Sequence, residues 1–241
     1  MRFWRSIVAV RPVFVPCFDG KTYVKTEMVE FEWFAGMAVS QKQKSIASLH
    51  SAATQELALQ QVLEVSSKSS FESGVALSAF NLAFTTVKPV FNTTVECAFQ
   101  GSKVFTDGGP FADIFHKSSR EAKGDQRLQD SGRLIGFEFF GNRWPLEPQT
   151  AFYDWLYLNA LHKNKQLSKT VMDYQAFTDI EFNPKKSINC QAYSVALYVS
   201  LRQRGLLEET IKNKESFMTH ALQATVSNAR EDLAVQAALL F

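Results

Sequence analysis

The spacing of apolar positions changes from segment to segment along the chain, and this spacing predicts the secondary structure. Apolar and polar residues alternate in segments such as Met28–Trp33, which is typical of a strand with one buried face. Elsewhere apolar residues recur every three or four positions, as from Ile46 to Leu57, which is typical of an amphipathic helix. The expected strands are Val13–Val15, Met28–Trp33, Val62–Val65, Val75–Phe84 and Ile135–Phe140. The expected helices are Ser40–Leu57, Val95–Phe105, Ser118–Arg127, Phe152–Leu161, Ala192–Leu201 and the tail Glu208–Phe241.

Residues with capping chemistry mark where several of these helices begin and end. Ser118 followed by Glu121 has the spacing of a capping box. Ser40 and Ser187 are expected N-caps, and Gly205 is expected to end the helix that follows Ser187. No internal repeat and no Pro/Gly/Ser-rich linker divides the chain. We therefore expect one helix-rich α+β domain with small β elements and a helical C-terminal extension.

Composition and charge exclude several classes of protein. The 241 residues include 21 Phe and only 21% charged residues, which is too aromatic a composition for a disordered chain. The formal net charge of +2 is too small to attract a polyanion in bulk, so any nucleic-acid site has to be local. Cys17, Cys97 and Cys190 lie far apart and are odd in number, which favours reduced thiols. No leader segment and no apolar run of about 18 residues is visible, so a cytoplasmic chain without membrane contact is expected.

Common catalytic and metal motifs are absent from the sequence. The four His residues are isolated, and none has a second His or Cys at ligand spacing, so neither a metal nor a cofactor is expected. The chain has no G-x-S-x-G elbow, no Walker loop and no G-x-G-x-x-G. Gly108-Gly109-Pro110 has the composition of a turn.

The most informative segment is Val95–Phe105, where polar side chains form a narrow stripe. On a helix, Glu96, Gln100 and Lys103 fall on one side, because they are separated by four and then three residues. Their neighbours are apolar or small, so this helix is expected to be mostly buried and to line a cleft. An alternative is a Glu96–Lys103 pair at the edge of the core that does no chemistry.

A carboxyl and an amine in such a setting can carry out covalent catalysis. Burial lowers the pKa of a lysine, and the neutral amine is then a nucleophile for a carbonyl-like carbon such as a sugar anomeric centre. The product is a Schiff base, while the carboxyl donates and removes protons.

Other polar residues suggest contacts with a phosphorylated or nucleic-acid ligand. Asp179 stands in an alternating apolar setting, and Asn189 and Gln191 lie at the start of an expected helix, where phosphate oxygens bind readily or where the two residues simply cap. One face of an expected helix carries three cations, Arg120, Lys123 and Arg127. This face could bind a phosphate backbone, and the alternative is that it is a solvated surface. The segment Phe152–Tyr157 contains four aromatic rings, those of Phe152, Tyr153, Trp155 and Tyr157. Most of them are expected in the core, and one or two could stack on a base.

Several blocks of the sequence together resemble a known family. Blocks similar to the NADAR family, also called YbiA-like, are Leu77–Asn81, Val95–Lys103, Phe177–Asp179 and Ser187–Cys190. Blocks similar to its branch encoded beside DarT-type ADP-ribosyltransferase toxins are Gly36-Met37, Gln41–Ile46, Gly132–Gly136 and Thr150–Leu156. The resemblance runs from about Arg11 to Leu207. It implies a NADAR core at residues 71–207, an N-terminal elaboration at 1–70 packed on it, and a C-terminal helical extension at 208–241 without a counterpart.

The resemblance implies an activity and site residues. NADAR antitoxins are ADP-ribosyl hydrolases that remove ADP-ribose from the guanine amino group of DNA. Lys103 would form the imine, Glu96 would be the general acid/base, and Asp179 and Asn189 would bind the ribose, with the diphosphate near the helix after Ser187. Distant members carry Trp-Gly after the Asp, where this chain has Ile180-Glu181-Phe182, so no Trp role is transferred there. The remaining candidates for substrate binding are Asn81, Gln100, Arg120, Trp144 and Gln191.

The expected partners are ADP-ribosylated DNA, taken to be single-stranded, and the product ADP-ribose. Two alternatives stay open at this point. The chain could be a non-catalytic antitoxin that binds the cognate DarT-type toxin directly, as its long amphipathic tail suggests. It could also cleave an N-glycosidic bond in a related free ADP-ribosylated nucleotide.

Overall fold

The computed structural model describes residues 7–184 and 187–223. Helix accounts for about 43% of the described residues and strand for about 21%, so the fold is α+β, as the sequence predicted. The strands are β1 (Ile7–Pro16), β2 (Val24–Trp33), β3 (Val62–Glu64), β4 (Ala83–Thr85), β5 (Asn92–Thr94), β6 (Lys103–Phe105), β7 (Leu134–Phe139), β8 (Asn142–Trp144) and β9 (Ala176–Thr178). The helices are α1 (Val39–Leu57), α2 (Glu72–Ala76), α3 (Val95–Gly101), η1 (Ala112–His116), α4 (Ser119–Lys123), α5 (Arg127–Asp130), α6 (Ala151–Lys163), α7 (Lys165–Thr170), η2 (Val171–Asp173), α8 (Gln191–Gln203), α9 (Leu207–Ile211) and α10 (Lys214–Gln223).

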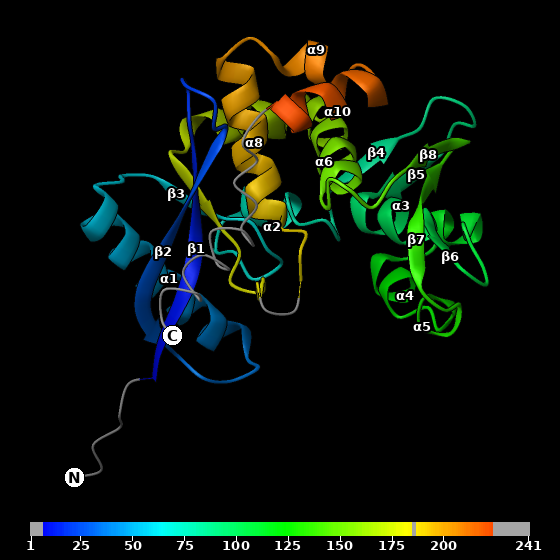
Figure 1. The fold of residues 1–241 in the computed structure, drawn as a ribbon. Coiled ribbons are helices and arrows are strands. Elements are labelled where there is room, and N and C mark those ends of the chain that lie inside the picture. The colour runs from blue at the N-terminus through cyan, green and yellow to red at the C-terminus, as the bar shows by residue number, and fades with distance from the viewer. Residues whose placement is uncertain (1–6, 185–186, 224–241) are drawn as a thin grey trace, which may run out of the picture.

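Three sheets are arranged around the central helices α6 and α8 (Figure 1). The largest sheet has the strand order β2-β1-β9-β3, with β1 antiparallel to β2 and β9, and β3 parallel to β9. The others are the β4-β5 pair and the β6-β7-β8 sheet. The first and last strands of the chain therefore share one sheet, and Asp179 follows directly after β9.

The β1–β2 ribbon is buried on opposite faces by two cores. Val13 of β1 and Phe31 of β2 pack in a smaller core with Leu49 of α1. Phe14, which points the other way because strand side chains alternate, belongs to the large core with Tyr198 of α8. The ribbon thus joins the two cores.

Aromatic rings fill the large core between α3, the β6-β7-β8 sheet and α6. Phe137 lies 4.9 Å from Phe152 and 5.3 Å from Phe99, measured between ring centroids. Tyr157 of α6 is fully buried, and its hydroxyl donates to Leu77 O at 2.5 Å. The Phe-rich composition therefore serves mainly to build this core.

Several element and cap predictions are confirmed. The expected strands at Val13–Val15, Met28–Trp33 and Ile135–Phe140 lie within or overlap observed strands, and α1, α6 and α8 contain the expected helical segments. Ser118 and Glu121 form the capping box of α4. Gly205 adopts a φ of +70°, and the Leu206 N–H donates to Leu201 O at 2.9 Å, which is a Schellman ending of α8.

The expected strand Val75–Phe84 is wrong except at its end, where Ala83 and Phe84 begin β4. Its first residues belong to α2, and the chain continues in turns, with Leu82 N–H donating to Ser78 O at 2.8 Å. A Cβ at Gly74 would lie 2.1 Å from Glu64 O, so α2 packs against β3 with no room for a side chain. Leu77, Ala79 and Leu82 of this segment are therefore buried by turns, and only its end pairs as a strand.

The expected helix over Val95–Phe105 is too long. Helix α3 ends at Gly101, and Lys103 begins β6, where it pairs with Phe137 of β7. The Glu138 N–H donates to Ser102 O at 2.7 Å, and this bond draws the chain into the sheet. Lys103 therefore leaves the helical stripe.

Two N-cap predictions and one helix length are also wrong. Helix α1 has Ala38 as its N-cap, and α8 has Cys190, so neither Ser40 nor Ser187 caps its helix. The polar helix after Ser118 ends at Gly124, and α5 begins separately at Arg127. In the tail, α9 and α10 are helical, and residues 224–241 lie outside the described residues.

Candidate active site

A short loop at residues 77–81 brings the beginnings of three helices together. Ala79 O accepts a hydrogen bond from Glu96 N–H in the first turn of α3 at 2.9 Å. On its other side, Ala79 N–H donates to Gln191 Oε1, at the start of α8, at 2.7 Å. Phe80 O accepts from the Ser119 hydroxyl of α4 at 2.7 Å. Residues that are distant in sequence therefore surround one loop.

Glu96 and Gln100 form a buried polar pair on α3. Both side chains are less than 9% exposed, and Gln100 Nε2 donates to Glu96 Oε1 at 2.9 Å, as their four-residue separation on a helix permits. Gln100 Oε1 is buried and has no hydrogen-bond partner within the described part of the chain. This carbonyl can accept a hydrogen bond from a ligand.

The amine of Lys103 lies against an aromatic ring. Its Nζ is 5.1 Å from the centroid of Phe99, and it forms no ion pair with Glu96 among the described residues. Burial lowers the pKa of Lys103, the Glu96 carboxylate opposes this shift, and the nearby Lys123 cation adds to it. The amine is thus easier to deprotonate than an exposed lysine.

Asp179 is held in a tight turn after β9. Its Oδ1 accepts from Glu181 N–H at 3.0 Å and from Phe182 N–H at 3.2 Å, and its side chain also bonds to Gln191. Burial raises the pKa of Asp179 to about 7, against the effect of these hydrogen bonds. The carboxyl is therefore able to exchange a proton near neutral pH.

The structure places a second buried carboxyl, Glu64 of β3, beside Asp179. Glu64 Oε1 accepts from Ile180 N–H at 2.8 Å and from the Ser66 hydroxyl at 2.6 Å, and Oε2 accepts from the Thr178 hydroxyl at 2.7 Å. The carboxyl thus binds the residues on both sides of Asp179, Thr178 through its hydroxyl and Ile180 through its backbone N–H. Burial, with the nearby Asp179 adding to it, raises the pKa of Glu64 to about 8.

Glu64 is not among the site residues predicted from the sequence, although its position in an apolar strand could have indicated it. It interrupts the apolar run Val62–Val65, and an acid within a buried strand needs partners. His50 of α1 lies behind it, with Nε2 2.8 Å from the Thr178 hydroxyl, and burial lowers the pKa of His50 to about 4. This chain of polar groups connects α1 with the strand end that carries Asp179.

Asn189 and Gln191 flank the start of α8 and differ in how their amides are used. Gln191 Nε2 donates to Val65 O at 2.6 Å, so this side chain ties β3 to the 77–81 loop as well as to Asp179. Asn189 Oδ1 is buried without a partner in the described residues. Gln191 is therefore committed to internal bonds, whereas Asn189 has an acceptor available.

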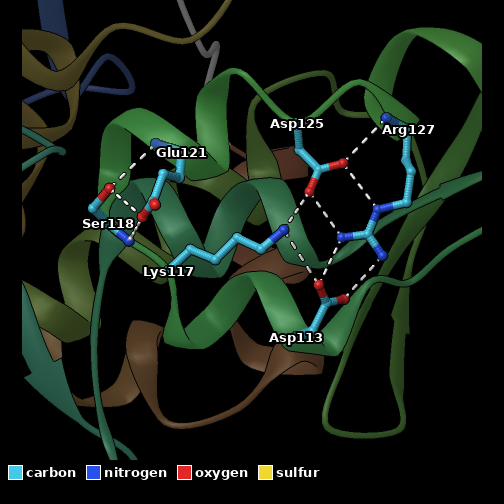
Figure 2. A network of polar contacts seen from close by, with 6 residues as sticks. All are labelled: Asp113, Lys117, Ser118, Glu121, Asp125 and Arg127. Atoms are coloured by element: carbon cyan, nitrogen blue, oxygen red, sulfur yellow. Dashed lines mark hydrogen bonds and ion pairs between the residues drawn. The ribbon is translucent and has the colours of Figure 1, made fainter.

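The expected basic face of Arg120, Lys123 and Arg127 does not exist as one surface. Arg127 lies on α5 and is occupied by Asp113 and Asp125, with closest contacts of 2.7 and 2.8 Å (Figure 2). Arg120 and Lys123 are exposed on α4, and Lys123 Nζ lies 5.2 Å from the Phe80 ring centroid. Arg120 and Lys123 form no ion pair within the described residues, and Lys123 is the one of the three that contacts the 77–81 loop.

The other two substrate-binding candidates lie in different surroundings. Asn81 is exposed in the 77–81 loop, and its Nδ2 donates to Val75 O at 2.9 Å. Trp144 is 3% exposed and packs in the core 5.0 Å from Trp155 and 5.5 Å from Phe152. That burial leaves little of the Trp144 ring for a base to stack on.

Among residues 7–184 and 187–223, no group of three or more His, Cys, Asp or Glu side chains is placed to hold a metal ion. Over the same residues, every helix is too short or too polar to cross a bilayer. The chemistry of the site is that of an amine, carboxyls and amides.

Comparison with known families shows to which one the chain belongs. A family model described as DarT1-associated NADAR antitoxin matches residues 9–231. The match continues past Leu207, so the expectation that the C-terminal extension has no counterpart is wrong for α9 and α10. No curated protein matches the chain.

Proposed function

Because the chain belongs to the DarT1-associated NADAR antitoxin family, we propose that it is an ADP-ribosyl hydrolase that removes ADP-ribose from the guanine amino group of DNA. Membership in the family makes it an antitoxin for a DarT-type toxin. Hydrolysis of the modification that such a toxin adds would explain this protection.

The observation that carries the proposal is the amine of Lys103. It lies over the Phe99 ring with its pKa lowered by burial, and it is not neutralised by an ion pair with Glu96 in the described residues. A purely structural Glu–Lys pair would show such a contact. The arrangement instead leaves the amine available as a nucleophile and the carboxyl available for proton transfer.

The proposed reaction proceeds through an imine. Glu96 donates a proton to the ring oxygen of the distal ribose as its bond to the anomeric carbon opens, and neutral Lys103 adds to that carbon. The guanine amino group leaves with a proton, and the anomeric carbon remains bound to the lysine nitrogen as an imine. Water then adds, the lysine leaves as an amine, and ADP-ribose is released.

The substrate contacts follow from the acceptors that lack partners. Gln100 Oε1 and Asn189 Oδ1 are buried and unpaired in the described residues, and ribose hydroxyl groups are donors that match them. Asp179 lies in the same polar neighbourhood, because Tyr153 interacts electrostatically with both Glu96 and Asp179. The diphosphate is placed near the start of the 13-residue helix α8, whose N-cap residue Cys190 makes no side-chain capping bond.

Borohydride trapping tests the covalent step. The full chain, incubated with ADP-ribosylated single-stranded DNA and borohydride, should form a covalent adduct through reduction of the imine. Lys103→Ala should abolish the adduct, whereas Lys169→Ala, at an exposed position on α7, should leave it unchanged. An adduct of equal yield in Lys103→Ala would refute the role of this lysine.

A non-catalytic antitoxin that binds its toxin is the second candidate, suggested by the helical tail. Leu207, Ile211 and Phe217 of this tail are buried in the large core, so deleting it would damage the fold. Point variants therefore discriminate better than truncation. If Glu96→Ala and Lys103→Ala still protect cells from the toxin, the binding function is correct and the hydrolase is not.

The third candidate is cleavage of a free ADP-ribosylated nucleoside. Turnover on modified DNA should exceed turnover on the free nucleoside and should fall with salt, because only DNA presents backbone phosphates to exposed cations such as Lys123. Equal turnover without a salt effect would favour the free nucleotide as substrate.

A further inference from the structure

The beginning of α1 carries a cluster of cations and aromatic rings that the proposed hydrolysis does not use. The Trp33 ring lies close to two cations, with the guanidinium carbon of Arg11 at 5.4 Å and Nζ of Lys42 at 4.7 Å from its centroid. Lys44 Nζ lies 6.0 Å from the Phe34 ring centroid. These five residues, here named the Trp33 cluster, come from β1, β2, α1 and the segment between β2 and α1, on the side of the molecule away from α4 and α5 (Figure 1).

The positive charges of the Trp33 cluster have no acidic partner. None of the ion pairs in the described residues includes Arg11, Lys42 or Lys44. Arg11 is half-buried, which lowers its pKa, and its Nε is buried without a hydrogen-bond partner in the same residues. An unpaired cation that has lost part of its hydration is stabilised by an anion.

Glu30 and Glu32 of β2 point away from the cluster, and Glu27, which shares a ribbon face with Arg11, is paired with Lys25. Glu30 pairs with Val10, and Glu32 pairs with Val8. Arg11 and Trp33 stand at odd-numbered positions of the two paired strands, so their side chains project from the opposite face of the ribbon. The first turn of α1 contains no acid, and its N-cap Ala38 makes no side-chain bond, so the positive end of this 19-residue helix adds to the field.

We propose that the Trp33 cluster is a second contact for the DNA strand, in which Arg11, Lys42 and Lys44 bind backbone phosphates and the rings support a base. Cations interleaved with aromatic rings are characteristic of surfaces that bind single-stranded nucleic acid without sequence preference. The inference rests on the proposed function, because it takes the substrate to be DNA.

Helix α1 connects this contact with the candidate active site. His50 follows Lys42 by eight residues, which is about 12 Å along a helix. His50 in turn contacts Thr178, the residue before Asp179. A strand bound at the cluster would need roughly three to four stacked nucleotides, at about 3.4 Å each, to cover those 12 Å toward the end of β9.

The salt dependence of binding to an unmodified, fluorescently labelled single-stranded oligonucleotide tests this contact. In the full-length chain, the double variant Lys42→Gln/Lys44→Gln should lower the slope of log affinity against log salt by about 1.4, since each phosphate contact on a single strand contributes about 0.7. The matched control Lys165→Gln/Lys169→Gln changes two exposed lysines of α7 and should leave the slope unchanged. Equal thermal midpoints would show that both variants are folded.

The outcomes separate this inference from the hydrolase proposal. A slope drop confined to the Lys42/Lys44 variant supports the contact even if modified DNA is never hydrolysed. Hydrolysis with no slope drop in this variant overturns the contact alone. An unchanged DNA slope together with lost binding to purified toxin would also overturn it, because the cluster would then be a protein interface.

Discussion

Replacing Glu64 tests whether a buried carboxyl beside the candidate site is protonated in the folded chain. The side chain is 1% exposed, and its two oxygens accept hydrogen bonds from Ser66, Thr178 and Ile180. Glu64→Gln keeps the shape and one acceptor, and it places an amide donor where a protonated carboxyl would have its hydroxyl. The Thr178 hydroxyl can accept from that donor, because neutral His50 is able to rearrange its own bond to Thr178.

The expected effect on stability depends on pH. The pKa of Glu64 in the folded chain, about 8, lies above the ordinary value of 4.5, so folding favours the protonated form. The contribution of the protonated Glu64 carboxyl to the free energy of unfolding is therefore complete below pH 4.5 and is lost as the pH rises toward 8. One pH unit in this window is worth about 1.4 kcal/mol. Because the Asp179 charge causes part of the shift and Asp179 itself has a pKa of about 7, we expect wild type to lose about 2 kcal/mol relative to Glu64→Gln between pH 5.5 and 7.5.

Urea unfolding followed by tryptophan fluorescence at the two pH values measures this difference. Glu64→Ala is the contrasting variant, because it leaves a cavity and the buried Ile180 N–H without a partner, and it should cost about 3 kcal/mol at both pH values. If Glu64→Gln and wild type lose stability in parallel between pH 5.5 and 7.5, the carboxyl is not protonated in the folded chain.

Four further outcomes are expected. Gly74→Ala should destabilise the fold by about 2 kcal/mol in urea unfolding, because its Cβ would meet Glu64 O at 2.1 Å, whereas Gly124→Ala, whose Cβ would come no closer than 3.3 Å to Arg120 O, should cost less; equal costs would contradict the close packing. Arg127→Ala should lower thermal stability by about 1 kcal/mol, less at high salt, and should not change the salt slope of DNA binding, since Arg127 already pairs with Asp113 and Asp125; a weaker slope would show that it contacts DNA. Gln100→Met should reduce kcat on modified DNA about tenfold with little change in unfolding, through loss of its bond to Glu96, and an unchanged kcat would remove Gln100 from the site. The hydrolysis rate should rise with pH until the Lys103 amine is neutral, at a pH below the ordinary lysine pKa of 10.5, and a flat profile would argue against an amine nucleophile.

Local patterns predicted the elements that depend on neighbouring residues. The spacing of Ile46, Leu49 and Ala53 places them on the buried face of α1, and the Ser118–Glu121 capping box forms as expected. Gly205 ends α8 because its left-handed backbone suits glycine. These features involve contacts within a few residues and can be inferred from sequence.

The failed predictions involve contacts between distant segments. Lys103 lies outside α3 because the bond between Ser102 and Glu138 places it in a sheet. Helix α2 packs against β3 so closely that a side chain at Gly74 would meet Glu64 O. The pairing of Arg127 with Asp113 depends on η1 folding beside α5. Helical spacing nevertheless predicted the Glu96–Gln100 contact, while Glu64 becomes informative only when the fold places Thr178 and Ile180 around it.

The pairing of β1 with β9, which are far apart in sequence, affects when the antitoxin can act during its own synthesis. Phe14 of β1 pairs with Phe177 of β9, and the 77–81 loop receives its bond from Gln191 only after α8 begins. A ribosome must therefore translate codon 191 before all of these contacts can form, and such long-range pairing folds slowly. Newly made protein would protect the cell only after the start of α8 has been translated, so a condition that halts translation before that point favours the toxin.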